Sequence, residues 1–137
     1  MAAGESSRDG VPDGLYAGQV WRIPDRLLTF ADADPASRTL HRDRPVLVVQ
    51  DDDIGANADC TTVLVMPLSS STANRRRWED ELAVEESPLD RASIVKVHLL
   101  QPIPRAVLAA GATWIGDIDE AALLRILARL VANLGLT

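Results

Sequence analysis

Arg44 is the side chain in this sequence best placed to hold a phosphate group. It directly precedes the β-branched run 45–50, which is typical of a strand buried on both faces. An arginine fixed at a strand start can present its planar guanidinium to a phosphate through two hydrogen bonds. The same side chain could instead form an ion pair with Asp43 or Asp25, and the sequence leaves both interpretations open.

Ser69 and the two histidines extend this candidate chemistry. Ser69 follows the predicted strand 61–68, where its hydroxyl could donate to a phosphoryl oxygen or simply stabilise a turn. Cleavage of RNA without a metal needs a base for the 2′-hydroxyl proton and an acid for the leaving 5′-oxygen, and histidine suits either role near neutral pH. The only histidines are His41 and His98.

His98 ends the predicted strand 92–99, two residues after Lys96, so we expect both side chains on one face of that strand. In that position Lys96 would favour a neutral His98, as a general base requires. His98 could equally be a partly buried strand residue, and His41 lies in a long loop where a surface role is the alternative. We therefore expect Arg44, Ser69 and His98 to meet in one groove if the chain is an enzyme.

The overall charge opposes a nucleic-acid partner, whereas the local charge permits one. The net charge is −6 and the sequence pI is about 4.8. Basic residues nevertheless form two clusters that could bind RNA, or could be solvated loops. The first cluster comprises Arg38, His41, Arg42 and Arg44, and the second comprises Arg75, Arg76 and Arg77.

Several other classes find no support in the sequence. It has no phosphate-binding glycine loop, no dinucleotide fingerprint, no metal-ligand spacing and no nucleophile elbow, so we expect neither cofactor nor metal. Cys60 is the only cysteine, which suits a reducing cytoplasm. Residues 1–14 lack the apolar run of a signal peptide and are expected to be a disordered tail, followed by a single domain over 15–137.

Apolar periodicity predicts a mainly β protein with one C-terminal helix. A long polar connection at 25–43 separates the first two strands, and loops of that length are usually functional or disordered. Strands are expected at 18–23, 45–50, 61–68, 79–85 (an edge strand), 92–99 and 113–115. Pro102 and Pro104 bound the strand at 92–99.

The C-terminal segment has the spacing of an amphipathic helix, with leucines recurring from 123 to 134. Asp117 and Glu120 resemble a capping box at its start. Gly135 fits the position after its end, with Leu136 completing a Schellman motif. Short strands followed by one such helix predict a barrel-like sheet with the helix packed on it.

An ordered set of motifs resembles the MazF/PemK toxin family over residues 17–136. The most specific is the run 44–50, Arg-Pro-Val-Leu-Val-Val-Gln, followed by a turn at 53–57. The run 18–21, Gly-Gln-Val-Trp, resembles the opening motif of the family, and 62–69 resembles its third strand with a terminal Thr or Ser. The run 93–95, Leu108, Gly116 and the run 134–136 also fall in register.

The resemblance implies an SH3-like barrel (a twisted antiparallel sheet) with a C-terminal helix, and a homodimer. It implies a sequence-specific endoribonuclease that cuts single-stranded RNA without a metal, leaves a 2′,3′-cyclic phosphate and is inhibited by an acidic, partly disordered antitoxin. It assigns catalytic roles to Arg44 and, with Ser in place of the usual Thr, to Ser69.

Three parts of the sequence depart from the family pattern. Residues 38–41 hold no carboxylate where many relatives carry one, Lys96 and His98 replace an Arg and an Asp of some relatives, and Leu99 replaces a Gln. Proton transfer would then fall to His98 and His41. The rival interpretations are a non-catalytic SH3-like module that binds nucleic acid or a partner peptide, and a toxin that acts on a protein such as gyrase.

Overall fold

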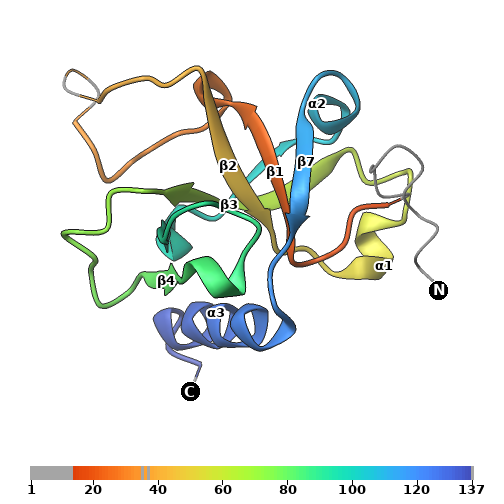
Figure 1. The fold of residues 1–137 in the computed structure, drawn as a ribbon. Helices are drawn as coiled ribbons and strands as arrows, with labels where there is room; N and C mark the ends of the chain where they lie inside the picture. Colours follow the sequence, from red (N-terminus) through yellow and green to blue (C-terminus); the bar gives the residue numbers. More distant parts are fainter. Residues whose placement is uncertain (1–13, 35, 37, 137) are drawn as a thin grey trace.

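The chain folds as a strongly curled antiparallel sheet with one long helix against it (Figure 1). This computed structural model describes residues 14–34, 36 and 38–136. The seven strands are β1 (Gln19–Pro24), β2 (Asp43–Val48), β3 (Thr62–Ser69), β4 (Asp80–Leu82), β5 (Ser93–Val95), β6 (Gln101–Pro104) and β7 (Thr113–Asp117). The sheet has the order β4-β5-β3-β2-β1-β7, and β6 also pairs with β3. The predicted barrel-like β fold with a C-terminal helix is confirmed.

Strand β3 closes the curl because its two halves pair with different partners. Its first half pairs with β6, from Thr62 opposite Pro104 to Val65 opposite Gln101. Its last residues pair with β5, with Ser69 opposite Ile94. The apolar faces of the curled sheet therefore pack against each other.

Strand β2 is central and buried on both faces, as its β-branched run predicts. Val46 and Val48 pack in one apolar cluster with Ile103. Leu47 packs in the other, with Met66 of β3 and Ile126 of the C-terminal helix. All six side chains are at most 1% exposed. Because both faces are covered, the register of β2 is firmly fixed, and with it the position of Arg44.

The prediction of one strand over 92–99 is wrong. Strand β5 ends at Val95, and Val97–Leu99 form a short 3-10 helix instead. Lys96 and His98 therefore do not share a strand face. The chain resumes as β6, which the sequence analysis missed because of Pro102 and Pro104. Both prolines are tolerated because β6 pairs with β3 alone, so they cost no second ladder of hydrogen bonds.

Helix α3 (Glu120–Asn133) covers one apolar cluster with Ala122 and Ile126. The predicted capping box is wrong, because the N-cap is Asp119 and Asp117 belongs to β7. The Schellman motif is confirmed. The N–H of Gly135 donates to the Ala132 carbonyl and that of Leu136 to the Val131 carbonyl, with Gly135 at φ +76°.

Two long connections border the same side of the sheet (Figure 1). One joins β1 to β2, begins with the 3-10 helix Asp25–Leu27 and is otherwise irregular. The other joins β3 to β4. Further short helices are α1 (Asp52–Gly55), α2 (Ala106–Ala109) and the 3-10 turn Val84–Glu86. The expected N-terminal tail lies, apart from Gly14, outside the described residues. In the described part of the chain, no helix is long and apolar enough to cross a membrane.

Candidate active site

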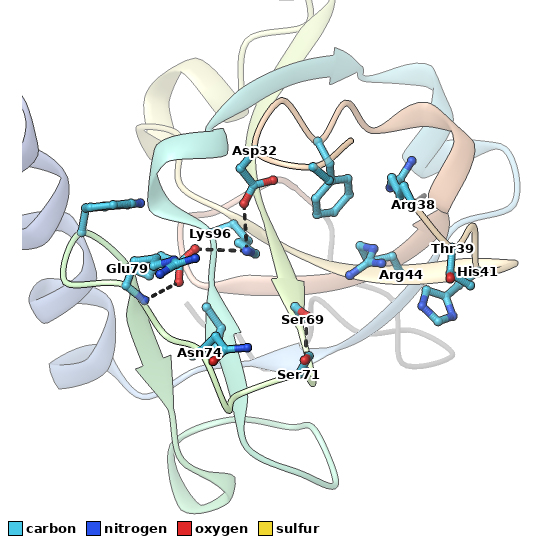
Figure 2. A pocket seen from close by; sticks show the side chains of 15 residues that line it. Asp32, Arg38, Thr39, His41, Arg44, Ser69, Ser71, Asn74, Glu79 and Lys96 are labelled. Carbon is cyan, nitrogen blue, oxygen red and sulfur yellow. Dashed lines mark hydrogen bonds and ion pairs between the residues drawn. The ribbon is translucent and has the colours of Figure 1, made fainter. Parts of the chain in front are cut away.

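A groove of about 760 Å³ lies between the two long connections, at the ends of β2, β3 and β5 (Figure 2). We call it the Arg44 groove. It contains both Arg44 and Ser69, together with the candidates His41, Lys96 and Arg76. Its remaining lining comes from Phe30, Asp32, Ala33, Arg38, Thr39, Ser71, Asn74, Trp78, Glu79 and Ile94.

Strand register explains why Arg44 and Ser69 meet. Strands β2 and β3 are antiparallel with Val46 opposite Pro67. The same register, continued by two residues, sets Arg44 opposite Ser69. The side chain of Arg44 also donates from Nη1 to the Leu68 carbonyl at 3.1 Å. The two residues that carry the family resemblance are thus fixed at one end of a rigid strand pair.

A buried carboxylate orients Arg44 from below the groove. Asp25 is fully buried, and its Oδ1 accepts a hydrogen bond from Arg44 Nε at 3.0 Å. Oδ1 also pairs with Arg38 Nη2, and Oδ2 accepts from the backbone N–H of His41 at 2.8 Å. Burial alone would raise the pKa of Asp25. The His41 hydrogen bond and the two arginines outweigh burial, so the pKa is lowered and the carboxylate stays charged.

Phe30 gives the two arginines a flat apolar support. The guanidinium carbon of Arg38 lies 4.2 Å from the ring centroid and that of Arg44 lies 4.6 Å from it. Such cation–π contacts restrain a guanidinium without using its N–H groups. For Arg44, the hydrogen bonds within the described residues use Nε and Nη1. Nη2 therefore remains available to a ligand in the groove.

Of the two interpretations of Arg44, the ion pair with Asp25 is observed, and the phosphate-binding role stays a prediction. The ion pair orients the side chain toward the groove rather than removing it. Ser69 also combines a turn role with an open position, because its Oγ accepts a hydrogen bond from the Ser71 N–H at 3.3 Å. The hydroxyl hydrogen of Ser69 is therefore still free to donate into the groove.

A second groove of about 530 Å³ adjoins the first and shares His41, Arg44, Ser69 and Ser71 with it. Its far wall carries Arg22 and Arg91. Arg44 and Ser69 thus lie in the middle of an extended depression rather than at its edge. That arrangement suits a chain-like ligand that passes the two residues in both directions.

Lys96 is held between two carboxylates and connects both loops to the sheet (Figure 2). Its Nζ lies 3.0 Å from Asp32 Oδ2 and 3.1 Å from Glu79 Oε2. Burial would lower the pKa of Lys96, but the hydrogen bonds to Asp32 and Glu79 outweigh it and raise the pKa above its usual value. Lys96 therefore stays protonated and supplies charge and position, not a proton-accepting group.

His98 is not in the Arg44 groove. It is exposed and faces the end of α3, where Asn133 Nδ2 lies 3.3 Å from His98 Nδ1. The expected meeting of Arg44, Ser69 and His98 is therefore wrong for His98. The cause is the early end of β5 at Val95, which turns residue 98 away. His41 takes the place near Arg44, because the connection between β1 and β2 folds back along the groove.

The residues of the two predicted basic clusters do not all lie in one site. Arg76 lines the Arg44 groove, and Arg77 lines a neighbouring hollow. Arg75 Nη1 donates to the Glu79 carbonyl at 3.1 Å. Arg42 is exposed beside the groove and lines neither of its two parts.

Sequence analysis missed three residues that shape the site: Phe30, Glu79 as a groove carboxylate, and Asp25 as the anchor of two arginines. Asp25 directly follows the strand that Pro24 ends, and complete burial of an aspartate at such a point signals a paired charge. That burial is visible only in the structure. Across residues 14–34, 36 and 38–136, no three His, Cys, Asp or Glu side chains are grouped as metal ligands would be.

Fold and groove together define a small curled-sheet protein with an oriented arginine, Arg44, in its main groove. Residues 28–134 match the profile of a family described as "PemK-like, MazF-like toxin of type II toxin-antitoxin system". The chain belongs to this family. Membership supports ribonuclease activity. No curated protein sequence matches the chain.

Solved structures with the same fold include several toxins. A mycobacterial endoribonuclease is 18% identical, with 88% of this chain and 91% of that chain covered at a TM-score of 0.62. A mycobacterial endoribonuclease in complex with its cognate antitoxin is 16% identical, with 89% and 94% covered at 0.60. The MazE-MazF complex of Deinococcus radiodurans is 17% identical, with 89% and 95% covered at 0.59. At these identities the likeness concerns the fold.

Proposed function

We propose that this toxin is an endoribonuclease that cleaves single-stranded RNA in the Arg44 groove without a metal. The observation that carries the proposal is that Arg44 and Ser69, from two different strands, line the same groove. A phosphate there would meet a charged donor and a hydroxyl donor together. The mycobacterial endoribonucleases named above share the fold that brings these two strand ends together.

In the proposed reaction the 2′-oxygen of one ribose attacks the adjacent phosphorus as its proton passes to a base. The bond from phosphorus to the 5′-oxygen breaks, and an acid protonates that oxygen. The products are a 2′,3′-cyclic phosphate and a free 5′-hydroxyl. Arg44 stabilises the extra negative charge of the pentavalent phosphorane, and Ser69 donates a further hydrogen bond.

Proton transfer falls to His41 in this scheme, because it lines both parts of the groove beside Arg44 and Ser69. Lys96 lies on the opposite wall, where its two ion pairs hold Asp32 and Glu79 in place and offset part of their negative charge near the phosphate. Asp32 and Glu79 are the carboxylates of the groove, and both are engaged by Lys96. His98 has no part in the chemical step, since it lies outside the groove.

Replacing Arg44 tests the proposal directly. Arg44→Ala should lower the cleavage rate on the order of 10²–10³, the usual effect of removing one transition-state donor. Arg44→Lys keeps the charge but loses the planar fork, so it should recover only part of the rate. Arg105→Gln is the matched control, because Arg105 contacts the Asn57 carbonyl near α1 and is remote from the groove. A folded Arg44→Ala protein that cuts mixed-sequence RNA at the wild-type rate would refute the proposal.

The products and the metal requirement are tested in the same assay. Cleavage in excess chelator should proceed at the wild-type rate. The 5′ fragment should have the mass of a cyclic phosphate, which is one water less than that of a linear phosphate. A linear phosphate from the first turnover, or loss of activity in chelator, contradicts the scheme.

The two histidines are separated by a pH–rate profile. His41→Ala should lose most of the rate and its dependence on pH near neutrality, where histidine side chains change charge. His98→Ala should keep the shape of the wild-type profile. The opposite pattern would return the proton transfer to His98.

We also propose that two copies of the chain form a homodimer and that a cognate antitoxin inhibits it in the cytoplasm. Both ideas rest on the family and on the similar solved structures, one of an endoribonuclease with its cognate antitoxin and one of MazE-MazF. A ~15 kDa monomer in sedimentation at micromolar protein would contradict the dimer, since the chain mass is 14.8 kDa.

The antitoxin is best matched by an acidic, disordered segment that folds over the run Arg75 to Arg77. All three arginines are exposed on the connection that borders the Arg44 groove. An acidic peptide there would pair with them and cover the substrate path. Reversal of the three charges should weaken binding of both the antitoxin and RNA. Unchanged affinity for both would refute this placement.

A chain that binds RNA but cleaves it at no pH would instead be the non-catalytic module considered above.

A further inference from the structure

A second hollow at the end of α3 combines an exposed aromatic ring with cationic side chains. We call it the Trp78 hollow. It has a volume of about 420 Å³ and is lined by Arg77, Trp78, His98, Arg129, Ala132 and Asn133. Trp78 is 40% exposed, which is unusual for the largest apolar side chain in a small protein.

The Trp78 backbone is bonded to α3, and its ring lies beside that of His98. Asn133 Nδ2 donates to the Trp78 carbonyl at 2.8 Å. The indole lies 5.9 Å from the His98 ring, centroid to centroid, at an interplanar angle of 45°. Because the Trp78 carbonyl fixes which way the Asn133 amide points, Nδ2 also faces His98 Nδ1 at 3.3 Å. In neutral His98 the N–H is then at Nε2, on the side of the ring away from Asn133.

The positive charge of the hollow is not neutralised within the chain. Among the described residues, neither Arg77 nor Arg129 forms an ion pair. The Nε of Arg129 is buried and has no hydrogen-bond partner within that part of the chain. Of the carboxylates that follow Trp78 in the sequence, Glu79 pairs with Lys96, and Asp80 pairs with Arg125 through Oδ1 while its Oδ2 has no hydrogen-bond partner among the described residues. An anionic ligand would compensate the two guanidiniums.

The hollow continues the Arg44 groove. Trp78 lines both the Arg44 groove and the Trp78 hollow. It also lines a third, smaller hollow together with Lys96 and His98. A polymer bound across Arg44 and Ser69 would therefore reach the exposed indole as its next contact. An aromatic face beside unpaired arginines is the usual platform for one nucleotide of a single strand.

We propose that the Trp78 hollow binds a nucleotide that flanks the cleaved bond, with its base on the indole and its phosphate on Arg77 and Arg129. This inference rests on the proposed ribonuclease function but concerns binding rather than chemistry. Base stacking is tolerant of sequence, so the hollow adds affinity and restricts where the strand runs. The specificity for particular bases then comes from other parts of the groove.

The test uses a mixed-sequence single-stranded DNA of about 12 nucleotides, a length within the site sizes of single-strand binders. DNA lacks the 2′-hydroxyl, so it binds without being cut. In a Trp114→Phe background, which leaves the buried Trp21 and the exposed Trp78, binding should quench tryptophan fluorescence. The quench should vanish in Trp78→Phe. Trp78→Ala should weaken binding about fivefold to 150-fold, the range for loss of one base–aromatic stack.

Charge variants separate phosphate binding from nonspecific attraction. Arg77→Gln and Arg129→Gln should each weaken DNA binding, whereas Arg105→Gln should not. Arg77 is exposed and forms no ion pair in the described chain, so its loss leaves the fold intact. On RNA, the loss in Trp78→Ala should fall on KM more than on kcat.

The outcomes distinguish this proposal from the proposed function. One outcome is cleavage of RNA at the wild-type rate without a Trp78-dependent quench, and another is a Trp78→Ala protein that binds the DNA as tightly as wild type. Either result overturns the proposed nucleotide site in the Trp78 hollow and leaves the proposed ribonuclease function intact. Trp78-dependent DNA binding without cleavage at any pH supports the hollow and refutes the ribonuclease. Quenching by an acidic peptide but not by DNA overturns the assignment in favour of a protein partner.

Discussion

Replacing Asp25 should disturb the orientation of the Arg44 side chain while leaving its charge unchanged. Asp25→Asn keeps the size of the side chain but leaves the guanidiniums of Arg38 and Arg44 without their carboxylate. The two arginine side chains are only 17% and 11% exposed, so little water replaces the lost partner. Breaking a buried pair typically costs 3–5 kcal/mol, and the partial exposure here favours about 3 kcal/mol. For a chain of this length that corresponds to a fall in Tm of about 10 °C.

The same change should slow catalysis without abolishing it. Arg44 keeps its hydrogen bond to the Leu68 carbonyl and its contact with Phe30. Its guanidinium then explores more orientations, and only some of them face the phosphate. We expect kcat to fall about tenfold to a hundredfold, less than the 10²–10³ typical for complete loss of such a donor.

Asp80→Asn is the matched control. Asp80 is a nearly buried aspartate that pairs with Arg125 Nε of α3 at 3.2 Å and does not line the Arg44 groove. Its loss should lower the free energy of unfolding and leave kcat unchanged. The assay is urea unfolding together with kcat on one oligoribonucleotide at a temperature where both variants are folded. Wild-type kcat in Asp25→Asn would show that Arg44 is positioned without Asp25, and the reasoning would fail.

The lowered pKa of Asp25 predicts the direction in which the stability of the fold changes with pH. It is lowered in the folded state, so the folded chain binds a proton less readily than the unfolded chain. The ion pairs therefore stabilise the fold fully above the unfolded pKa of about 4, and this stabilisation is lost as the pH falls below it. Wild type should lose more stability than Asp25→Asn between about pH 5 and pH 2. Parallel acid dependence in the two proteins would contradict the pairing.

Three further outcomes are expected. Lys96→Met should destabilise the fold by about 2 kcal/mol because the buried Glu79 loses its cationic partner and keeps only the Arg76 N–H, and hydrogen exchange should show faster opening around Asp32; exchange at the wild-type rate would contradict this link. Gly135→Ala should cost about 1 kcal/mol from its positive φ alone, since no atom lies within 4 Å of the added Cβ, and should leave cleavage unchanged. Arg76→Gln should reduce the slope of log affinity against log salt by about 0.7 for single-stranded nucleic acid, which titration at several salt concentrations measures.

The fold could be predicted from the sequence wherever one side-chain pattern dominates. The run 45–50 has β-branched residues without alternation, and only a strand covered on both faces suits it. The ending at Gly135 likewise follows from local chemistry, because few residues other than glycine accept its conformation. The prediction of a strand over 92–99 was wrong because the β-branched pattern continues to Val97, whereas the pairing of β5 with its neighbouring strands ends at Val95. Whether a strand continues there depends on tertiary pairing and not on propensity.

Only part of the site could be predicted from the sequence, because the rest also depends on tertiary contacts. Arg44 and Ser69 could be found because each stands at the end of a recognisable strand. Asp25 was one of two possible partners for Arg44, but its additional pair with Arg38 could not be predicted, because the two arginines lie 13 and 19 residues away. Their contact depends on how the irregular connection folds, and no periodicity describes an irregular segment. The same applies to His98, whose direction follows from a single 3-10 turn.

The charges of the site divide into two groups with different tasks. Arg44 and Lys96 are held by buried or half-buried carboxylates, which fix their geometry but cancel much of their long-range field. Arg76, Arg77 and Arg129 form no ion pair within the described chain, so their field is not cancelled locally. An acidic protein can then attract a polyanion through the second group and act on it through the first. Orientation and attraction are thus supplied by different residues, which is why a net charge of −6 is compatible with an RNA groove.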